Sequence, residues 1–194
     1  MLFEGKPVDV ISINKTRLDN TIDDPEMKIP GYDLFRKDRS RNGGGVALYV
    51  RNVFNTINKT HTANVYLEAV RVEILKPKAK PILIATVYRP PNSGSDYMNN
   101  LECFLHELDN NNKEIIFTGD LNCDFLSDVH QAHTHKLTEL LNVHQLEQVI
   151  TDPTRITCNS ESLIDILATN KLDKLLNCGV LHVGISNQSC LWMF

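Results

Sequence analysis

Two oxygen-bearing side chains follow an apolar run in the segment IIFTGDLNCDF, residues 115–125. Asp120 and Asn122 stand one residue apart, so in an extended chain they project to the same side at the end of the run. A carboxylate and an amide placed together can orient a water molecule, hold a phosphate oxygen or bind a hard cation such as Mg²⁺. The same residue types also form turns that close strands, so this segment alone leaves both interpretations open.

Two other apolar segments carry a polar group that could likewise belong either to a functional site or to the structure of the strand. Tyr88 ends the run 81–88 and precedes an Arg-Pro-Pro turn, while Asp165 lies inside the apolar run 163–170. A buried carboxylate is costly unless it is paired, hydrogen-bonded or bound to a ligand. Asp165 is therefore either a site residue or a structural hydrogen-bonding group, with Thr154 as a candidate partner. Tyr88 is either a site residue or an aromatic side chain that ends a strand.

The elements that must position these groups follow from the hydrophobic pattern. Segments rich in β-branched residues and bounded by turn residues predict six strands, at 8–14, 44–51, 67–75, 81–89, 114–120 and 163–170. Leucine and phenylalanine at helical spacing predict helices over about 97–110 and 133–142. The continuously apolar runs at 81–88 and 114–120 indicate inner strands, and the partly alternating segment 67–75 indicates a half-buried strand. Helices that fall between strands predict an α+β sandwich with the sheets inside.

The composition is that of one ordinary globular domain spanning residues 1–194. Hydrophobic residues make up 42% and charged residues 23% of the chain, which argues against disorder. We expect no signal peptide and no transmembrane segment, because charges interrupt the N-terminus and no apolar run is long enough. Five cysteines without paired spacing favour a reducing compartment, so we expect a nuclear or cytoplasmic location. The net charge of −4 neither favours nor excludes binding to nucleic acid.

Five short motifs in a fixed order carry a resemblance to a known family. They are GGGVALYV, VYRPPNS, TGDLNCD, PTRIT and LIDILATN. From about Lys6 onward the chain resembles the endonuclease domain of non-LTR (LINE-type) retrotransposons. That domain belongs to the endonuclease/exonuclease/phosphatase superfamily, together with apurinic/apyrimidinic endonucleases and DNase I.

The resemblance implies a fold and an activity. The expected fold is α/β (α+β): a four-layer, DNase I-like sandwich of two mixed β-sheets flanked by helices. The expected activity is metal-dependent nicking of a DNA phosphodiester with Mg²⁺ or Mn²⁺, after which the freed 3′-hydroxyl primes reverse transcription. The implied partners are DNA and a downstream reverse transcriptase domain, and we expect a monomer that has no contact with a membrane.

The resemblance also implies roles for individual residues. Asp120 would orient or deprotonate the attacking water, Asn122 would hold the water or the phosphate, and both would contact the metal. Tyr88 would contact the phosphate through its hydroxyl, and Asp165 would orient a histidine that steadies the transition state. DNA contacts are expected from three basic residues, Arg39, Arg41 and Arg89.

Several positions depart from the family pattern. Lys15 stands where the family places a metal-binding glutamate, and Asn187 and Gln188 replace the Asp-His pair that closes the domain. We also expect the chain to begin after the family's first strand, which carries an asparagine. An ammonium in place of a carboxylate turns attraction for a metal into repulsion of about 4 kcal/mol per pair of unit charges. Losing an acid/base group costs about 10²–10⁴ in rate, so we expect impaired catalysis.

Two alternatives remain open at this stage. One is an active phosphodiesterase or phosphomonoesterase of the same superfamily, with a site rebuilt around Asp120, Asn122 and Asp165. The other is a folded, non-catalytic remnant that binds nucleic acid or a protein. The YRPP and PTRIT motifs favour the retrotransposon branch, and Lys15, Asn187 and Gln188 favour impairment.

Overall fold

The central element is a six-stranded mixed sheet. The computed structural model describes residues 8–60, 66–109, 113–127, 131–182 and 189–193. The strand order is β4-β5-β6-β7-β11-β8, in which only β6 and β7 are parallel. The bounds are β4 Asn55–Asn58, β5 Glu68–Leu75, β6 Ile82–Tyr88, β7 Glu114–Asp120, β8 Glu147–Gln148 and β11 Asp165–Thr169. The strands β6 and β7 that we predicted as inner strands do lie inside this sheet.

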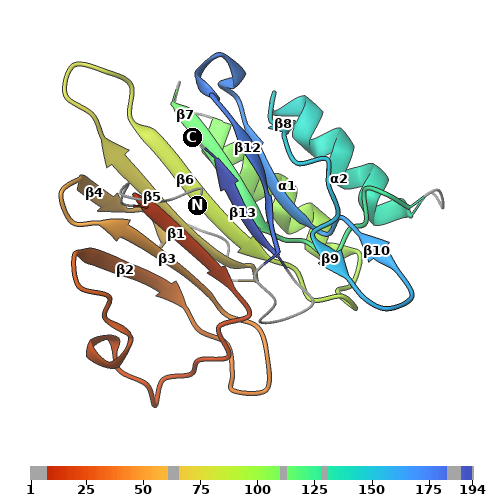
Figure 1. Ribbon diagram of the computed structural model, residues 1–194, viewed down its shortest axis with the longest axis horizontal. Coiled ribbons are helices and arrows are strands. Elements are labelled where there is room, and N and C mark those ends of the chain that lie inside the picture. The colour runs from red at the N-terminus through yellow and green to blue at the C-terminus, as the bar shows by residue number, and fades with distance from the viewer. Residues whose placement is uncertain (1–7, 61–65, 110–112, 128–130, 183–188, 194) are drawn as a thin grey trace.

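Two α-helices cover one face of the six-stranded sheet (Figure 1). Helix α1, Asp96–Asp109, connects the parallel strands β6 and β7, as a parallel pair requires, and α2, Ala132–Val143, follows β7. Both helices fall where leucine spacing predicted them. Their buried leucines, including Leu101, Leu105 and Leu137, pack with Ala85 and Phe117 of the sheet. None of the helices in the described ranges is long and apolar enough to span a membrane.

The opposite face of the large sheet packs against smaller sheets. Strands β1 Val10–Asn14, β2 Tyr32–Lys37 and β3 Val46–Arg51 form an antiparallel sheet with β3 in the middle. Val46, Leu48 and Val50 of β3 share a buried cluster with Val70 and Val72 of β5. The hairpin of β12 Cys178–Leu181 and β13 Cys190–Met193 packs against Leu167 of β11 and against Leu163, which precedes that strand. The expected α+β sandwich is confirmed.

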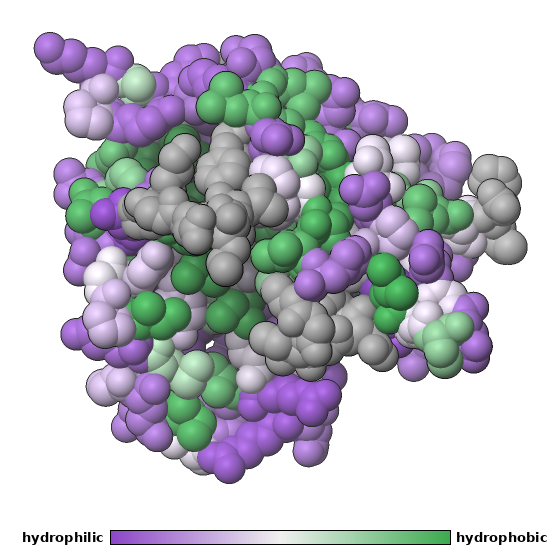
Figure 2. All heavy atoms as spheres, viewed as in Figure 1, coloured by the Kyte–Doolittle hydropathy of each residue, from purple (hydrophilic) through white to green (hydrophobic). Residues whose placement is uncertain are grey.

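Two short hairpin strands and two 3-10 turns complete the described elements. They are β9 Arg155–Ile156, β10 Glu161–Ser162, η1 Asp24–Met27 and η3 Leu172–Lys174. The expected pattern had two mixed sheets with helices on the outside. In the described ranges both α-helices lie on one side of the large sheet, and the three-stranded sheet is purely antiparallel. Figure 2 shows hydrophilic residues gathered over the turn between β2 and β3.

The expectation of a half-buried β5 was wrong. Arg71 is 7% exposed and Glu73 is 6% exposed, so the alternating polar positions face protein rather than water. Each finds an opposite charge, because Arg71 Nη1 lies 3.0 Å from Glu107 of α1 and Glu73 lies 2.6 Å from Lys113. Sequence alternation was misleading here because helix α1 and its flanking loop bring charged partners over that face.

Candidate active site

Strand register places the predicted site residues in one row. Glu68 of β5 is paired with Tyr88 of β6, Tyr88 with Asp120 of β7, and Asp120 with Asp165 of β11. Neighbours in register across a sheet project to the same face. Four polar side chains from consecutive strands therefore stand side by side at one edge of the large sheet. Tyr88, Asp120 and Asp165, which the sequence motifs singled out separately, are brought together.

Gly119 allows β7 to end beside β6 in this way. Its φ is 149°, and a Cβ built at this position would lie 1.9 Å from the carbonyl oxygen of Val87. Any side chain would therefore push the two strands apart just before Asp120. The close approach is completed by the Arg89 N–H, which donates to the Asp120 carbonyl oxygen at 2.8 Å.

Lys15 forms an ion pair with the central carboxylate of this row. It follows β1 in the smaller sheet, and its Nζ lies 2.7 Å from Asp120 Oδ2 and 5.5 Å from the centre of the Tyr88 ring. The Asp120 side chain is fully buried, whereas that of Lys15 is 30% exposed. A hydrogen bond from Ser12 Oγ to Thr86 Oγ1 at 2.7 Å joins the two sheets nearby. The packing of sheet on sheet thus positions the ammonium.

Asn122 closes strand β7 and also faces the cavity. It adopts a left-handed conformation with φ 48°, and its N–H donates to Asp120 Oδ1 at 3.1 Å, which is an Asx turn. Its side-chain Nδ2 donates to the Arg89 carbonyl oxygen at 2.7 Å. The same side chain lines the cavity beside the row. Asn122 therefore both closes the strand and contributes to the wall of the site.

Asp165 is a buried carboxyl with one unsatisfied oxygen. Its Oδ2 has no hydrogen-bond partner among the described residues. Burial, and then the Asp120 charge, raise the pKa of Asp165 to about 7. Thr154 lies beside it, as expected, and its hydroxyl oxygen accepts the N–H groups of Ile164 and Asp165, each at 3.1 Å.

The closing segment returns to this place in the fold. The N–H of Ser189 donates to the Thr154 carbonyl oxygen at 2.8 Å, next to Asp165 in the structure. The positions at which the sequence departs from the family's Asp-His pair, Asn187 and Gln188, lie outside the described residues.

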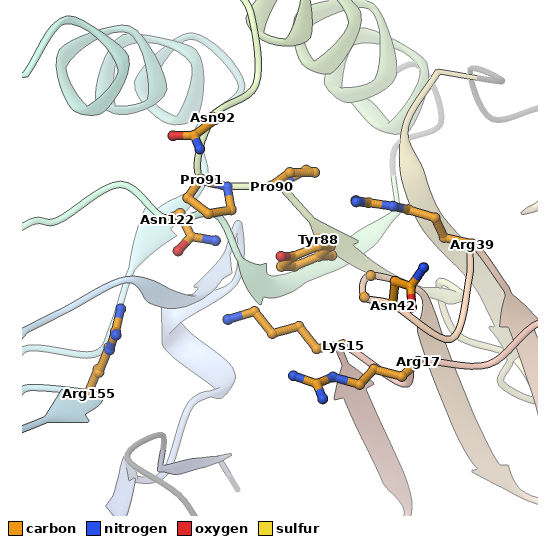
Figure 3. Close-up of a pocket in the computed structure, with 12 residues that line it drawn as sticks. Lys15, Arg17, Arg39, Asn42, Tyr88, Pro90, Pro91, Asn92, Asn122 and Arg155 are labelled. Atoms are coloured by element: carbon orange, nitrogen blue, oxygen red, sulfur yellow. The ribbon is translucent and has the colours of Figure 1, made fainter.

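A cavity of about 660 Å³ opens beside the row and is rich in positive charge. Its basic lining residues are Lys15, Arg17, Arg39 and Arg155, which come from three separate parts of the chain (Figure 3). Tyr88, Asn122 and residues of the Pro90–Asn92 turn form much of the remaining wall. Burial raises the pKa of the Tyr88 hydroxyl, so this group stays protonated as a hydrogen-bond donor at neutral pH. The arrangement is suited to a phosphate-bearing ligand.

Comparison with known proteins identifies the family. The sequence pattern described as endonuclease-reverse transcriptase matches residues 82–185, more than half of the chain. The chain belongs to the endonuclease-reverse transcriptase family. None of the proteins with curated descriptions is similar enough in sequence to be matched.

Solved structures show the same fold at low sequence identity. The endonuclease domain of TRAS1, a telomere-specific non-LTR retrotransposon, is 17% identical with a TM-score of 0.73, covering 94% of this chain and 84% of that one. An AP endonuclease from Archaeoglobus fulgidus is 15% identical with a TM-score of 0.68, covering 100% and 90%. A 3′-5′ exonuclease from Neisseria meningitidis is 14% identical with a TM-score of 0.69, covering 98% and 90%.

One of the expected DNA contacts of this family member is wrong. Arg89 is only 2% exposed, so its side chain cannot reach DNA. Its Nη1 donates to the carbonyl oxygens of Leu121 and Asn122, at 3.3 and 3.5 Å, and its guanidinium lies 5.8 Å from the centre of the Tyr97 ring. A buried arginine that binds two carbonyl groups holds the loop after β7 in place.

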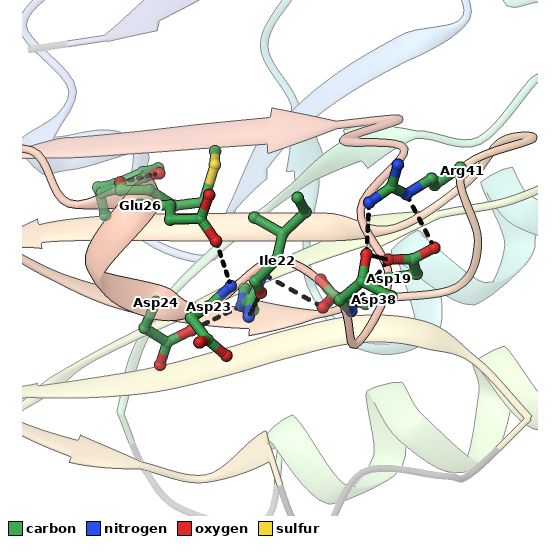
Figure 4. A network of polar contacts seen from close by, with 11 residues as sticks. Asp19, Ile22, Asp23, Asp24, Glu26, Asp38 and Arg41 are labelled. Atoms are coloured by element: carbon green, nitrogen blue, oxygen red, sulfur yellow. Dashed lines mark hydrogen bonds and ion pairs between the residues drawn. The ribbon is translucent and has the colours of Figure 1, made fainter.

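The two basic residues before β3 have different surroundings. Arg39 lines the cavity and lies 2.7 Å from Glu68, whose other oxygen accepts the Gly45 N–H at 2.6 Å. Arg41 is absent from the cavity lining, and its Nε donates to Asp19 at 3.1 Å in an exposed polar network (Figure 4). Arg39 is therefore placed at the site, whereas Arg41 lies outside it.

Sequence reasoning missed Arg17, Arg155 and Glu68 as site residues. Arg17 lies two residues after Lys15, just beyond the predicted strand 8–14, and Arg155 lies within the PTRIT motif. Both could therefore have been named as candidates from the sequence. Glu68 left none, because its role in holding Arg39 and the glycine turn depends on contacts between distant segments.

The residues around Asp120 do not fit a divalent metal. Superfamily nucleases generally depend on one, but here Asp120 Oδ2 is already bound by the Lys15 ammonium. Within the described ranges, no three His, Cys, Asp or Glu side chains form a group that could hold a metal ion. A second cation beside Lys15 would be repelled by about 4 kcal/mol per pair of unit charges at an effective dielectric near 20.

Proposed function

We propose that this chain is the endonuclease-type domain of a non-LTR retroelement that binds target DNA but cleaves it poorly. The observation that carries the proposal is the Lys15–Asp120 ion pair at the centre of the row, 2.7 Å long and built on a fully buried carboxylate. The parent activity would be the nick that supplies a 3′-hydroxyl primer to a reverse transcriptase encoded downstream. The match to the endonuclease-reverse transcriptase family supports this context.

Low cleavage follows from how the row is occupied. The carboxylate that would act on a water, Asp120, already has its Oδ2 bound by the Lys15 ammonium at 2.7 Å. Asp165 stands beside it, but the position where the family carries the histidine that Asp165 would orient is a glutamine, Gln188. An amide does not act as a titrating acid or base at neutral pH, so the expected acid/base partner is lost.

Binding of DNA, by contrast, is supported by groups that remain. The cavity beside the row presents Lys15, Arg17, Arg39 and Arg155 together with the Tyr88 hydroxyl. Lysine and arginine side chains are the usual contacts to nucleic-acid phosphates. A DNA-binding domain with little or no activity therefore fits the site better than an active phosphomonoesterase.

A plasmid-nicking assay tests the proposal. With Mg²⁺ or Mn²⁺ present, we expect the native chain to convert little or no supercoiled plasmid to the nicked form, while still retarding DNA in a gel. The triple variant Lys15→Glu/Asn187→Asp/Gln188→His restores the family's groups and is expected to nick measurably faster. Asp120→Ala in the triple background is the control for contaminating nuclease.

Two results would overturn the proposal. Vigorous nicking by the native chain that Asp120→Ala abolishes would show that the site is fully active. Absence of DNA binding by a cooperatively folded native chain would remove the function altogether.

A further inference from the structure

Lys15 stands between a buried carboxylate and an open cationic cavity. Its ammonium has three N–H donors, and Asp120 accepts from one of them across 2.7 Å. The side chain is still 30% exposed and lines the cavity. The remaining donors are therefore available to a ligand, so that one cation can contact the carboxylate and a bound anion together.

The backbone around Lys15 is held in place before any ligand arrives. The N–H groups of Thr16 and Arg17 donate to the carbonyl oxygens of Gly45 and Gly44, at 3.2 and 2.9 Å. These bonds fix the segment after β1 against the glycine turn before β3. A cation that is already positioned loses little entropy when the ligand binds.

The cavity also keeps an excess of positive charge. Asp120 pairs with Lys15 and Glu68 pairs with Arg39, but neither carboxylate lines the cavity. Arg17 and Arg155 line it as well, and neither forms an ion pair with another residue in the described ranges. The surplus therefore faces the cavity from opposite sides, from the segment after β1 and from β9 (Figure 3).

We propose that the Lys15 ammonium takes over the binding role of a divalent cation, so that the cavity holds a DNA phosphate without any metal. Lys15 bridges Asp120 and the phosphate, and Arg17, Arg39 and Arg155 contact the remaining phosphate oxygens or the next phosphate. The inference rests on the proposed function, because it takes DNA as the ligand. It concerns binding and adds no chemical step.

Fluorescence anisotropy with a labelled DNA duplex tests the inference. The native chain is expected to bind with the same dissociation constant, within about twofold, in EDTA and in Mg²⁺. Lys15→Gln is expected to weaken binding in EDTA by about tenfold and to reduce the slope of log affinity against log salt by about one. Lys15→Arg keeps the charge and should retain most of the affinity.

Matched variants separate a local effect from a general one. Lys78→Gln removes the same charge from the exposed β5–β6 turn, at the other end of β6 from Tyr88, and should leave the affinity within about twofold. The double variant Lys15→Gln/Asp120→Asn removes both charges of the pair. It should bind as weakly as Lys15→Gln while avoiding an unpaired buried carboxylate, so that weak binding cannot be attributed to misfolding.

The outcomes are distinct. Binding by the native chain that needs Mg²⁺ and disappears in EDTA would overturn the inference and leave the proposed function standing. Equal weakening by Lys78→Gln and Lys15→Gln would also overturn the inference. No binding in either buffer would instead defeat the proposed function.

Discussion

Asp120 shows how the role of a single residue depends on one neighbour. At the end of a buried strand beside Asn122 it has the position of a catalytic base. With the Lys15 ammonium 2.7 Å away and no exposed surface of its own, it is also the buried half of an ion pair whose other half is 30% exposed. Removing Lys15 would destabilise the folded protein, because the buried Asp120 charge would be left without compensation.

Asp165 is expected to make stability depend on pH. Its pKa is raised from 3.8 to about 7, mainly by burial. Below about pH 4 the folded and unfolded chains both hold the proton, and the full stability is present. Between about pH 4 and 7 only the folded chain holds it, so this contribution is lost by at most about 1.4 kcal/mol per pH unit.

Urea unfolding of the native chain and of Asp165→Asn from pH 4 to 8 measures this contribution. The variant should become steadily more stable relative to the native chain up to about pH 7, and the difference should then level off. Asp33→Asn, at an exposed strand position, controls for the loss of one negative charge. A difference that is constant with pH would contradict the assignment.

Arg89 is expected to matter for stability. Arg89→Met keeps the buried volume but leaves the carbonyl oxygens of Leu121 and Asn122 without their donor, which should cost about 1–3 kcal/mol of unfolding free energy. Arg41→Met removes an exposed arginine and should change stability by less than about 1 kcal/mol. Thermal unfolding compares them. An Arg89→Met protein with native stability and weakened DNA binding would show that Arg89 contacts DNA after all.

Among the secondary-structure elements, the site forms where the ends of neighbouring strands β5, β6, β7 and β11 lie side by side. The order β5-β6-β7-β11 places polar residues at one edge, and the end of β1 brings Lys15 from the other sheet. The six strands and two helices predicted from sequence all exist, with ends shifted by a few residues. Strands β2 and β4 were missed because their polar residues are typical of loops, and both lie at sheet edges where water solvates one side.

Gly119 is expected to be intolerant of any side chain. In Gly119→Ala the new Cβ would lie 1.9 Å from the Val87 carbonyl oxygen, so β6 and β7 must separate where Tyr88 and Asp120 pair. The expected loss is about 3 kcal/mol or more, measured by urea unfolding. Gly94→Ala is the matched control, because a Cβ there meets nothing within 4 Å. Similar stabilities for the two variants would refute this account of the strand end.

In the molecule as a whole, positive charge is concentrated at one cavity although the chain is acidic overall. The net charge is −4, yet four basic side chains line one cavity. A net-negative protein is repelled by DNA at long range, and salt screens that repulsion as well as the local attraction. Affinity should therefore depend on how many phosphates the cavity contacts and hardly at all on net charge.

The salt dependence of DNA binding measures that number. If two to four phosphates are neutralised, the slope of log affinity against log salt should lie between about −2 and −4. Anisotropy titrations over a range of NaCl concentrations provide the slope, and Arg155→Gln should make it shallower by about one. A slope near zero would show that phosphate contacts do not drive binding.

Four of the six strands of the large sheet, both α-helices and the family were predictable from the sequence. Hydrophobic periodicity is local, and each family motif is a short contiguous stretch of the chain, so both can be recognised without the fold. The sequence also placed Tyr88, Asp120, Asn122 and Asp165 together as candidates. The contact between Lys15 and Asp120, the burial of Arg89 and the place of Arg155 in the cavity wall became known from the folded structure alone. These facts depend on how one sheet packs on another and on where loops end, and no spacing along the chain encodes them.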